Sequence, residues 1–174
     1  MIYFIRHGET NYNKDMRFQG HLDVPLNTKG LVQANLALDS SKSIKIDKIY
    51  YSPLLRAKKT AEVINSFHNA QMIEDARLKE IYMGSLQGKA LKKLTEHEKL
   101  LAFSNPERFG GESHEEFCDR IKSFYNEIKN TKENILIVSH GGVYRAFYKI
   151  INNLNNLQFE MQPIPNATII TLKE

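Results

Sequence analysis

Two short stretches of the chain combine arginine, histidine and glycine in a way that suits the chemistry of a phosphate group. Arg6 and His7 stand side by side near the start, and His140 is followed directly by Gly141. Arginine can bind two phosphate oxygens through parallel hydrogen bonds. An imidazole with an ordinary pKa of about 6.5 is largely unprotonated at neutral pH and can attack phosphorus. These residues therefore favour an anion site with a histidine nucleophile.

Each of these stretches follows a short apolar run that we expect to form a buried strand. Residues 2–5, 46–51 and 135–138 are rich in β-branched and aromatic side chains. In open α/β sheets, ligands bind where parallel strands end and loops lead into helices. Arg56 comes shortly after the second run, so we expect it at the same rim as His7. The expected rim thus gathers two histidines and two arginines.

Segments of helical period alternate with the expected strands. A last strand is expected at Ala167 to Leu172, and a short one at Met72-Ile73. The apolar stripes of the helices are Leu31, Ala34 and Leu38; Ala57, Ala61 and Ile64; Phe117, Ile121, Phe124 and Ile128; and Val143, Phe147 and Ile150. Strands that alternate with helices predict an α/β fold, a three-layer α/β/α sandwich with a mostly parallel central sheet.

Three of these helices carry signals for their N-terminal ends. Ser52 offers a cap that is followed by Pro53 at the first helical position. Ser113 and Glu116 have the spacing of a capping box. Thr28 is expected to cap the helix that carries Leu31.

The stretch from residue 84 to residue 111 interrupts the alternation. It is rich in lysine and glutamate, with a helix expected through Leu91, Leu94 and Leu101 and a loop at 104–106. We therefore expect a single domain over residues 1–174, with this stretch as a small cap-like excursion near the site.

The chain has a mild positive charge, with a net charge of +4 and a pI near 9.0. Its lysines are scattered, and the densest group, Lys89, Lys92 and Lys93, fits a solvated helix face. A basic stripe with interleaved aromatic residues is absent from the sequence, so we do not expect a nucleic-acid partner. A small anionic substrate suits this charge.

Metal, disulfide and membrane functions are not expected either. Cys118 is the single cysteine, and the arginines beside the histidines would repel a cation. We expect no metal site and no cofactor. No run approaches the roughly 20 apolar residues of a membrane span, and residues 1–5 are too short for a signal peptide. The expected location is the cytoplasm.

The order of these motifs resembles the histidine phosphatase superfamily, also called the phosphoglycerate mutase-like family. The opening signature is matched by Arg6-His7-Gly8-Glu9-Thr10 with Asn13. Later blocks are matched by Gln19-Gly20, Asp23, Pro25-Leu26, Thr28 and Gly30; by Ser52-Pro53-Leu54, Arg56-Ala57 and Thr60-Ala61; by Leu78, Glu80 and Gly84; by Gly110-Gly111-Glu112-Ser113 and Arg120; and by Val138-Ser139-His140-Gly141-Gly142 and Arg145. The resemblance runs from residue 1 to about residue 172.

This resemblance implies a role for each matched residue. His7 would attack phosphorus and carry the phosphoryl group, and Arg6, Arg56 and His140 would surround the phosphate oxygens. Glu80 would donate a proton to the leaving alkoxide and then accept one from the attacking water. Further phosphate or substrate contacts would come from Asn13, Gln19, Gly20 and Gly141.

One segment departs from the family pattern. Gln87 stands in Gly84-Ser85-Leu86-Gln87-Gly88 where many relatives place a glutamate. We interpret the change as affecting substrate detail more than the reaction. The other histidines, His21, His68, His97 and His114, match no catalytic block and are expected to be surface or structural residues.

The family contains both hydrolases and mutases. Mutases are usually longer, and Glu9-Thr10 after the catalytic His-Gly resembles small phosphatases of the α-ribazole-phosphate type. We therefore expect a phosphomonoester hydrolase for a small phosphorylated metabolite, with specificity set by residues 84–111 and by Arg17, Phe18 and Tyr82. A cofactor-dependent phosphoglycerate mutase and a non-catalytic phosphate-binding regulatory module are the alternatives. The oligomeric state, monomer or homodimer, is left open.

Overall fold

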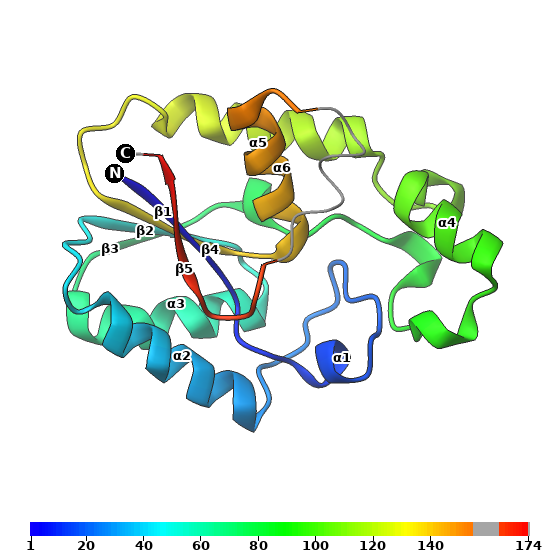
Figure 1. The fold of residues 1–174 in the computed structure, drawn as a ribbon, viewed down its shortest axis with the longest axis horizontal. Helices are drawn as coiled ribbons and strands as arrows, with labels where there is room; N and C mark the ends of the chain where they lie inside the picture. The colour runs from blue at the N-terminus through cyan, green and yellow to red at the C-terminus, as the bar shows by residue number, and fades with distance from the viewer. Residues whose placement is uncertain (155–163, 174) are drawn as a thin grey trace.

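The computed structural model has a central sheet in which four strands run parallel and one runs antiparallel (Figure 1). The structure describes residues 1–154 and 164–173. Within these ranges the strands are β1 (Ile2–Arg6), β2 (Lys48–Tyr51), β3 (Gln71–Glu74), β4 (Ile135–Ser139) and β5 (Ile169–Lys173). Their order across the sheet is β3-β2-β4-β1-β5, and β5 is the antiparallel strand.

Helices cover both faces of this sheet. The α-helices of the described residues are α1 (Asn11–Lys14), α2 (Thr28–Ser41), α3 (Leu55–His68), α4 (Glu96–Ser104), α5 (His114–Ile128) and α6 (Gly141–Asn152). Helices α2 and α3 lie on one face, and α5 and α6 on the other (Figure 1). The predicted three-layer α/β/α sandwich is confirmed. In the described part of the chain, no helix has the length and apolarity to span a bilayer.

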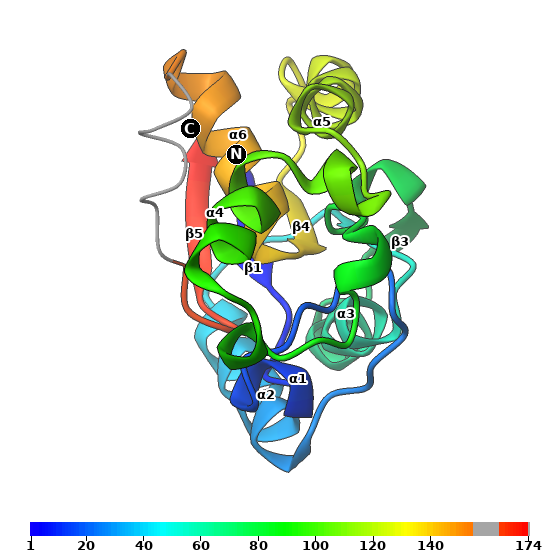
Figure 2. The same cartoon turned by 90° about the vertical axis from the view of Figure 1, so that its right-hand side faces the viewer.

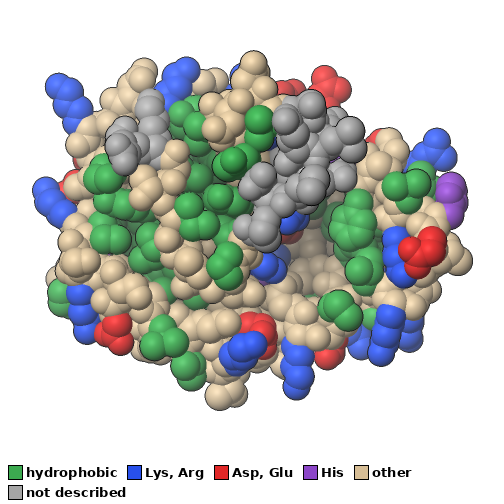
Figure 3. Space-filling view, viewed as in Figure 1, with side chains coloured by type: hydrophobic (Ala, Val, Ile, Leu, Met, Phe, Trp, Pro, Cys, Tyr) green, Lys and Arg blue, Asp and Glu red, His purple; other side chains and the backbone are tan. Residues whose placement is uncertain are grey.

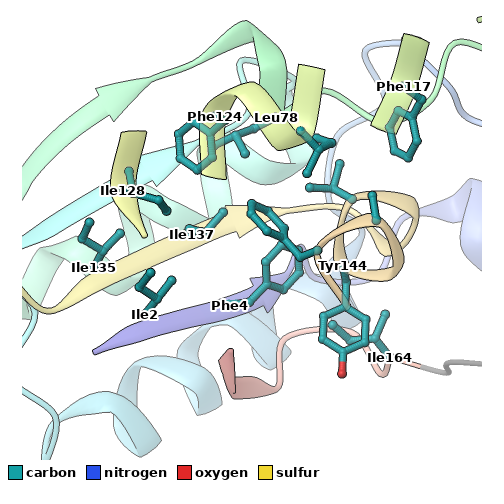
Figure 4. Packing of buried hydrophobic residues seen from close by; sticks show 14 residues of the cluster. Ile2, Phe4, Leu78, Phe117, Phe124, Ile128, Ile135, Ile137, Tyr144 and Ile164 are labelled. Atoms are coloured by element: carbon teal, nitrogen blue, oxygen red, sulfur yellow. The ribbon is translucent and has the colours of Figure 1, made fainter. Parts of the chain in front are cut away.

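The strand β1 shows why two helical layers are needed. Ile2 and Phe4 point into the layer of α5 and α6, whereas Tyr3 and Ile5 point into the layer of α2 and α3. The Phe4 ring packs against the Tyr144 ring of α6, with 5.5 Å between ring centroids (Figure 4). Because both faces of β1 are buried, its C-terminal end is held firmly where the next residues begin.

Helix α5 begins as the sequence predicted, and helix α3 does not. The capping box of Ser113 and Glu116 is present at α5. The predicted Ser52 cap of α3 is wrong, because the N-cap is Leu54 and the helix begins at residue 55. The Ser52 hydroxyl lies 2.8 Å from Nε2 of His140, a partner far away in the sequence. A tertiary contact has thus taken the group that would have capped the helix.

Helix α2 also differs in its cap and its buried stripe. Asn27, not Thr28, is the cap, and its side chain accepts a hydrogen bond from the backbone N–H of Gly30 at 2.8 Å. Leu31, expected in the core, is exposed. The buried face consists of small residues, Gly30, Ala34, Ala37 and Ser41. Small side chains let α2 lie close to the neighbouring α3 and to the loop after β1.

The excursion at residues 84–111 does not contain the single helix predicted through Leu91, Leu94 and Leu101. A short 3₁₀ helix spans Leu91–Lys93, the chain then becomes extended, and α4 begins at Glu96. The break occurs because Thr95 forms a capping box with Glu98 that starts a new helix. The segment that carries α4 lies at the end of the molecule toward which β1 and β4 run (Figure 2).

Candidate active site

The ends of β1 and β4 place the two histidines next to each other. His7 follows β1 directly, and its backbone N–H donates to the carbonyl of Ser139 at the end of β4 at 2.9 Å. His140 is the next residue after β4 and the N-cap of α6. The two imidazole rings meet edge-on with 5.2 Å between centroids. The structure therefore brings together the two histidines predicted at one rim.

The His7 imidazole is held in one tautomer. Its Nδ1 lies 2.7 Å from the carbonyl oxygen of Gly8, which can only accept, so Nδ1 carries the proton. Its Nε2 accepts a hydrogen bond from Nε of Arg56 at 3.3 Å. Burial, together with the charges of Arg56 and Arg6, holds the pKa of His7 well below 6.5. At neutral pH, Nε2 is therefore unprotonated, and its lone pair accepts the long hydrogen bond from Arg56 until a substrate is attacked.

Arg56 is fully buried near the start of α3 and is fixed by backbone carbonyls. Its two terminal nitrogens donate to the carbonyls of Leu22 at 2.7 Å and Gly20 at 2.8 Å. Burial lowers the pKa of Arg56 to about 10, so the guanidinium keeps its charge at neutral pH. Its Nε is thereby aimed at the His7 ring, where an anion would bind.

Two buried polar atoms at this site lack hydrogen-bond partners among the described residues. They are Nε of Arg6 and Nδ1 of His140. Arg6 donates from a terminal nitrogen to the carbonyl of Ile164 at 3.0 Å, and burial lowers its pKa. Unsatisfied groups of this kind are rare in folded proteins and indicate a missing ligand, ion or water.

Arg6 and Arg56 also lack ion-pair partners within the described part of the chain. Glu80 lies close enough to favour the charged form of both arginines, but no carboxylate of the described residues comes within ion-pair distance of either. An anion at the centre of the cluster would add negative charge and accept the free N–H group of Arg6. The N-terminal end of α6, which begins at Gly141, carries a partial positive charge from the helix dipole and therefore also favours an anion. The site is therefore built for an anion next to Nε2 of His7.

The Glu80 carboxylate lines the same cavity and is held by two backbone N–H groups. Gly142 donates to Oε2 at 3.1 Å and Ile81 donates to Oε1 at 3.0 Å. The backbone carbonyl of Glu80 accepts from Arg120 at 3.0 Å and lies 2.8 Å from Nε2 of His21. Both the backbone and the carboxylate of Glu80 are thus fixed beside the anion site.

Of the other residues predicted to contact the substrate, some line the cavity and others lie outside it. Gln19 and Gly20 line the cavity. Asn13 does not line it, and its side-chain oxygen instead accepts from the backbone N–H of Thr10 at 3.1 Å, in the capping box of α1. Tyr82, expected near the specificity region, lies in a separate shallow hollow.

Gln87, which departs from the family pattern, supports the loop that holds Arg56. Its side-chain oxygen accepts from the backbone N–H of His21 at 2.6 Å. A side chain at Gly20 would overlap that oxygen, so Gly20 leaves room for this contact. Because the carbonyl of Gly20 receives Arg56, Gln87 acts on the site through the loop and not by lining the cavity.

Several supporting residues were not predicted from the sequence. The Asn166 side chain donates to the backbone carbonyl of His7 at 2.7 Å, and His21 and Arg120 hold the backbone at Glu80. In each of these contacts the acceptor is a backbone carbonyl. Because every residue has such a carbonyl, the residue types along the sequence do not predict which one is used. Arg120 had a signal, since it belongs to a matched family block, but that block gave no role. The predicted surface or structural character of His97 agrees with its exposed position.

The cavity at the site has a volume of about 640 Å³. It opens on the face shown in Figure 3, where basic side chains lie on one side of a hollow and hydrophobic side chains on the other. Its charged end is lined by Arg6, His7, Arg56, Glu80 and Arg145. Among the described residues, no group of three His, Cys, Asp or Glu side chains is arranged to hold a metal ion.

Comparison with known proteins identifies the class to which this fold and site belong. The model of the histidine phosphatase superfamily (branch 1) matches residues 2–174, and the chain belongs to this superfamily. "Putative phosphoserine phosphatase 2" of Hydrogenobacter thermophilus is 37% identical over 160 residues, which cover 88% of this chain and 79% of that protein. "Phosphoglycerate mutase-like protein 4" of Arabidopsis thaliana is 36% identical over 159 residues, covering 85% and 69%.

Solved structures agree with this assignment. The α-ribazole phosphatase from Shigella flexneri superposes with a TM-score of 0.85 at 25% identity, over 97% of this chain and 87% of that one. The predicted resemblance to the small phosphatase branch is confirmed by this likeness. The names of the relatives include both phosphatases and a mutase-like protein.

Proposed function

We propose that this protein hydrolyses phosphomonoesters of small metabolites through a phosphohistidine at His7. One observation carries the proposal. The unprotonated Nε2 of His7 lies near the fully buried Arg56 and the partly buried Arg6, and neither arginine has an ion-pair partner among the described residues. A bound anion would balance the positive charge of this cluster. If that anion is the phosphate group of a substrate, it would bind next to Nε2 of His7, the proposed nucleophile.

In the first half of the reaction, the lone pair on Nε2 of His7 forms a bond to phosphorus as the ester P–O bond breaks. Arg6, Arg56 and His140 stabilise the charge on the phosphate oxygens. Loss of one such preorganised donor typically lowers the rate by about 10²–10³-fold. The leaving alkoxide takes a proton from Glu80, which lines the cavity beside the site and must be protonated for this step.

In the second half, water replaces the departed alcohol. Glu80, now ionised, accepts a proton from this water, whose oxygen attacks phosphorus. The N–P bond breaks, inorganic phosphate leaves, and His7 returns to its starting tautomer. The Gly8 carbonyl, which holds the proton on Nδ1, keeps Nε2 available for the next cycle.

Access of water favours hydrolysis over a mutase reaction. Three side chains of the cavity wall, Met16, Leu100 and Phe103, are at least half exposed to solvent. A mutase must protect its phosphoenzyme from water, and an open wall does not do so. The mutase alternative predicts phosphate exchange between 2- and 3-phosphoglycerate without net release of inorganic phosphate.

The test is a screen of phosphorylated metabolites, together with p-nitrophenyl phosphate, for release of inorganic phosphate. We expect release by the native protein and none by His7→Asn. Full activity of His7→Asn would contradict the proposal. Binding of phosphoesters without any turnover would instead support the non-catalytic binding module.

A further inference from the structure

Beyond the phosphate-binding end, the walls of the cavity are mostly apolar. The side chains that form this part include Met16, Phe18, Met83, Leu100, Phe103 and Phe117. They come from the chain after α1, from the segment of α4 and from α5. The cavity volume of about 640 Å³ lies within the range of sites that hold ligands much larger than a phosphate ion.

Large apolar side chains stay exposed in this cavity. Leu100 is 65% exposed, Met16 63% and Phe103 50%. Such groups are unfavourable in water, and their gathering in one concave site is typical of ligand-binding surfaces. Phe18 and Phe103 pack directly against each other, with 5.8 Å between ring centroids and 49° between ring planes. The two rings therefore belong to one continuous apolar surface of the cavity.

The apolar wall is supported from behind. Met83, Leu86, Leu94 and Ala102 form a buried cluster beneath it, and Phe18 packs against that cluster. The wall is therefore part of a small core, and its shape does not depend on a ligand.

Polar groups near this wall are already engaged. Arg17 donates to the carbonyl of Gly88 at 3.2 Å and lies over the Tyr12 ring at 5.6 Å. His114 has its Nε2 2.7 Å from the carbonyl of Phe103. The polar capacity that remains on this side belongs to the other N–H groups of Arg17, whose side chain is 42% exposed.

Arg145 lies at the opposite, phosphate-binding end. A side-chain carbon at Gly141 would stand 3.6 Å from Nε of Arg6 and 3.8 Å from a terminal nitrogen of Arg145. The two guanidiniums therefore share one neighbourhood, and Arg145 adds positive charge where the phosphate binds.

We propose that the alcohol half of the substrate is an apolar group, branched, cyclic or aromatic, held against the wall that Phe18 forms with the α4 side chains Leu100 and Phe103. This inference rests on the proposed phosphatase reaction and names its substrate class. The phosphate occupies the arginine end, and burial of the apolar group against the wall supplies the selectivity.

A series of n-alkyl phosphates tests the inference. Ethyl, butyl and hexyl phosphate have leaving alcohols of nearly equal acidity, so the chemical step stays constant. A fully buried methylene contributes about 0.8 kcal/mol, which is about fourfold in an equilibrium. We expect kcat/KM to rise about two- to fourfold for each added methylene. A flat series would overturn the inference.

A pair of double variants locates the effect. Leu100→Ser/Phe103→Ser should flatten the series, because it should lower kcat/KM for hexyl phosphate much more than kcat/KM for ethyl phosphate. The matched control, Leu36→Ser/Phe67→Ser, removes one exposed leucine and one exposed phenylalanine from α2 and α3. It should leave the series unchanged. A steep series in the first variant would contradict the assigned location.

Binding of the corresponding alkylphosphonates, measured by calorimetry, separates this inference from the reaction itself. Phosphonates resist hydrolysis, so their dissociation constants report the pocket alone. A chain-length dependence without hydrolysis of any phosphate ester would overturn the proposed reaction and support the apolar pocket. Hydrolysis combined with equal dissociation constants along the series would overturn the pocket and support the reaction.

Discussion

At the scale of single residues, His7 and His140 depend on their surroundings for their charge state. Both are buried, and the guanidinium of Arg56 lies near both rings. Burial is the first cause and positive neighbours are the second, and both hold the pKa of each histidine well below 6.5. The same groups that keep the proposed nucleophile unprotonated should therefore also make the folded protein sensitive to acid.

This arrangement predicts how stability changes with pH. In the unfolded chain the two imidazoles take up protons as the pH falls through about 6.5, whereas in the folded protein they stay neutral. The free energy of unfolding should therefore decrease below about pH 6.5, by at most about 1.4 kcal/mol per pH unit for each histidine. Urea unfolding between about pH 5 and pH 8 measures it.

His140→Gln should make this pH dependence less steep. His97→Gln, which changes an exposed histidine of α4, should not alter it. An equally steep dependence in His140→Gln would show that acid sensitivity comes from other groups.

Gly142 gives a second prediction at the residue scale. A side-chain carbon at this position would overlap Oε1 of Glu80. The carboxylate is the flexible end of its side chain, so Gly142→Ala should fold normally while Glu80 moves from its place. We expect kcat to fall about 10- to 100-fold with little change in thermal stability. Steady-state kinetics and thermal unfolding of one preparation measure both.

A double variant shows whether this loss acts through Glu80. Glu80→Gln alone should lower kcat strongly, and Gly142→Ala added to it should lower kcat no further. Independent, multiplying losses would mean that Gly142 affects the reaction by another route.

At the scale of elements, Arg120 of α5 holds the loop that carries Glu80. Its guanidinium donates to the backbone carbonyls of Arg77, Lys79 and Glu80. It also contacts Glu112, at 2.6 and 2.9 Å, and lies over the Phe117 ring at 4.6 Å. Helix α5 thus fixes the short 3₁₀ helix Ala76–Leu78 and the irregular residues that follow it, so we expect Arg120 to act as a positioning residue.

Arg120→Met should lower kcat about tenfold or more and leave the binding of inorganic phosphate nearly unchanged, because Glu80 moves and the arginine end does not. Arg77→Met is the matched control. Its side chain is ion-paired with Asp75 and Glu127 on the outer side of the same loop, and we expect kcat to stay unchanged. A fall in phosphate affinity equal to the fall in kcat would contradict a positioning role.

Elements could be predicted from the sequence where a local pattern decides the structure. Apolar runs in the sequence predicted the buried strands. Because His7 and His140 directly follow two of these runs, the sequence also predicted that they lie at the ends of β1 and β4. The prediction that Ser52 caps α3 was wrong because its hydroxyl contacts His140, which is distant in the sequence. The prediction that Leu31 is buried was wrong because the buried face of α2 consists of small residues. The apolar wall of the cavity depends on how α4 folds back, and spacing along the chain does not show this.

At the scale of the whole molecule, the positive charge at the site should couple phosphate binding to stability. Inorganic phosphate at about 100 times its dissociation constant should raise the free energy of unfolding by about 2.7 kcal/mol. Arg6→Gln/Arg56→Gln should abolish this gain. A thermal shift that persists in the double variant would place the phosphate elsewhere.

The positive charge at the site comes from arginine side chains, so we predict that chelators of metal ions do not affect the activity. Guanidinium groups surround the proposed phosphate position, so we expect EDTA to leave hydrolysis unchanged. Phosphate release measured before and after dialysis against EDTA tests this. Activity lost on dialysis and restored by a divalent cation would contradict a reaction carried by arginines alone.

The most direct test of the central proposal is to trap the phosphoenzyme. The protein is mixed with ³²P-labelled substrate, quenched in alkali within the first turnover, digested and mapped by mass spectrometry. We predict alkali-stable, acid-labile phosphate on the peptide that contains His7, and none in His7→Asn. Label on another residue, or rapid hydrolysis without any labelled protein, would contradict the account.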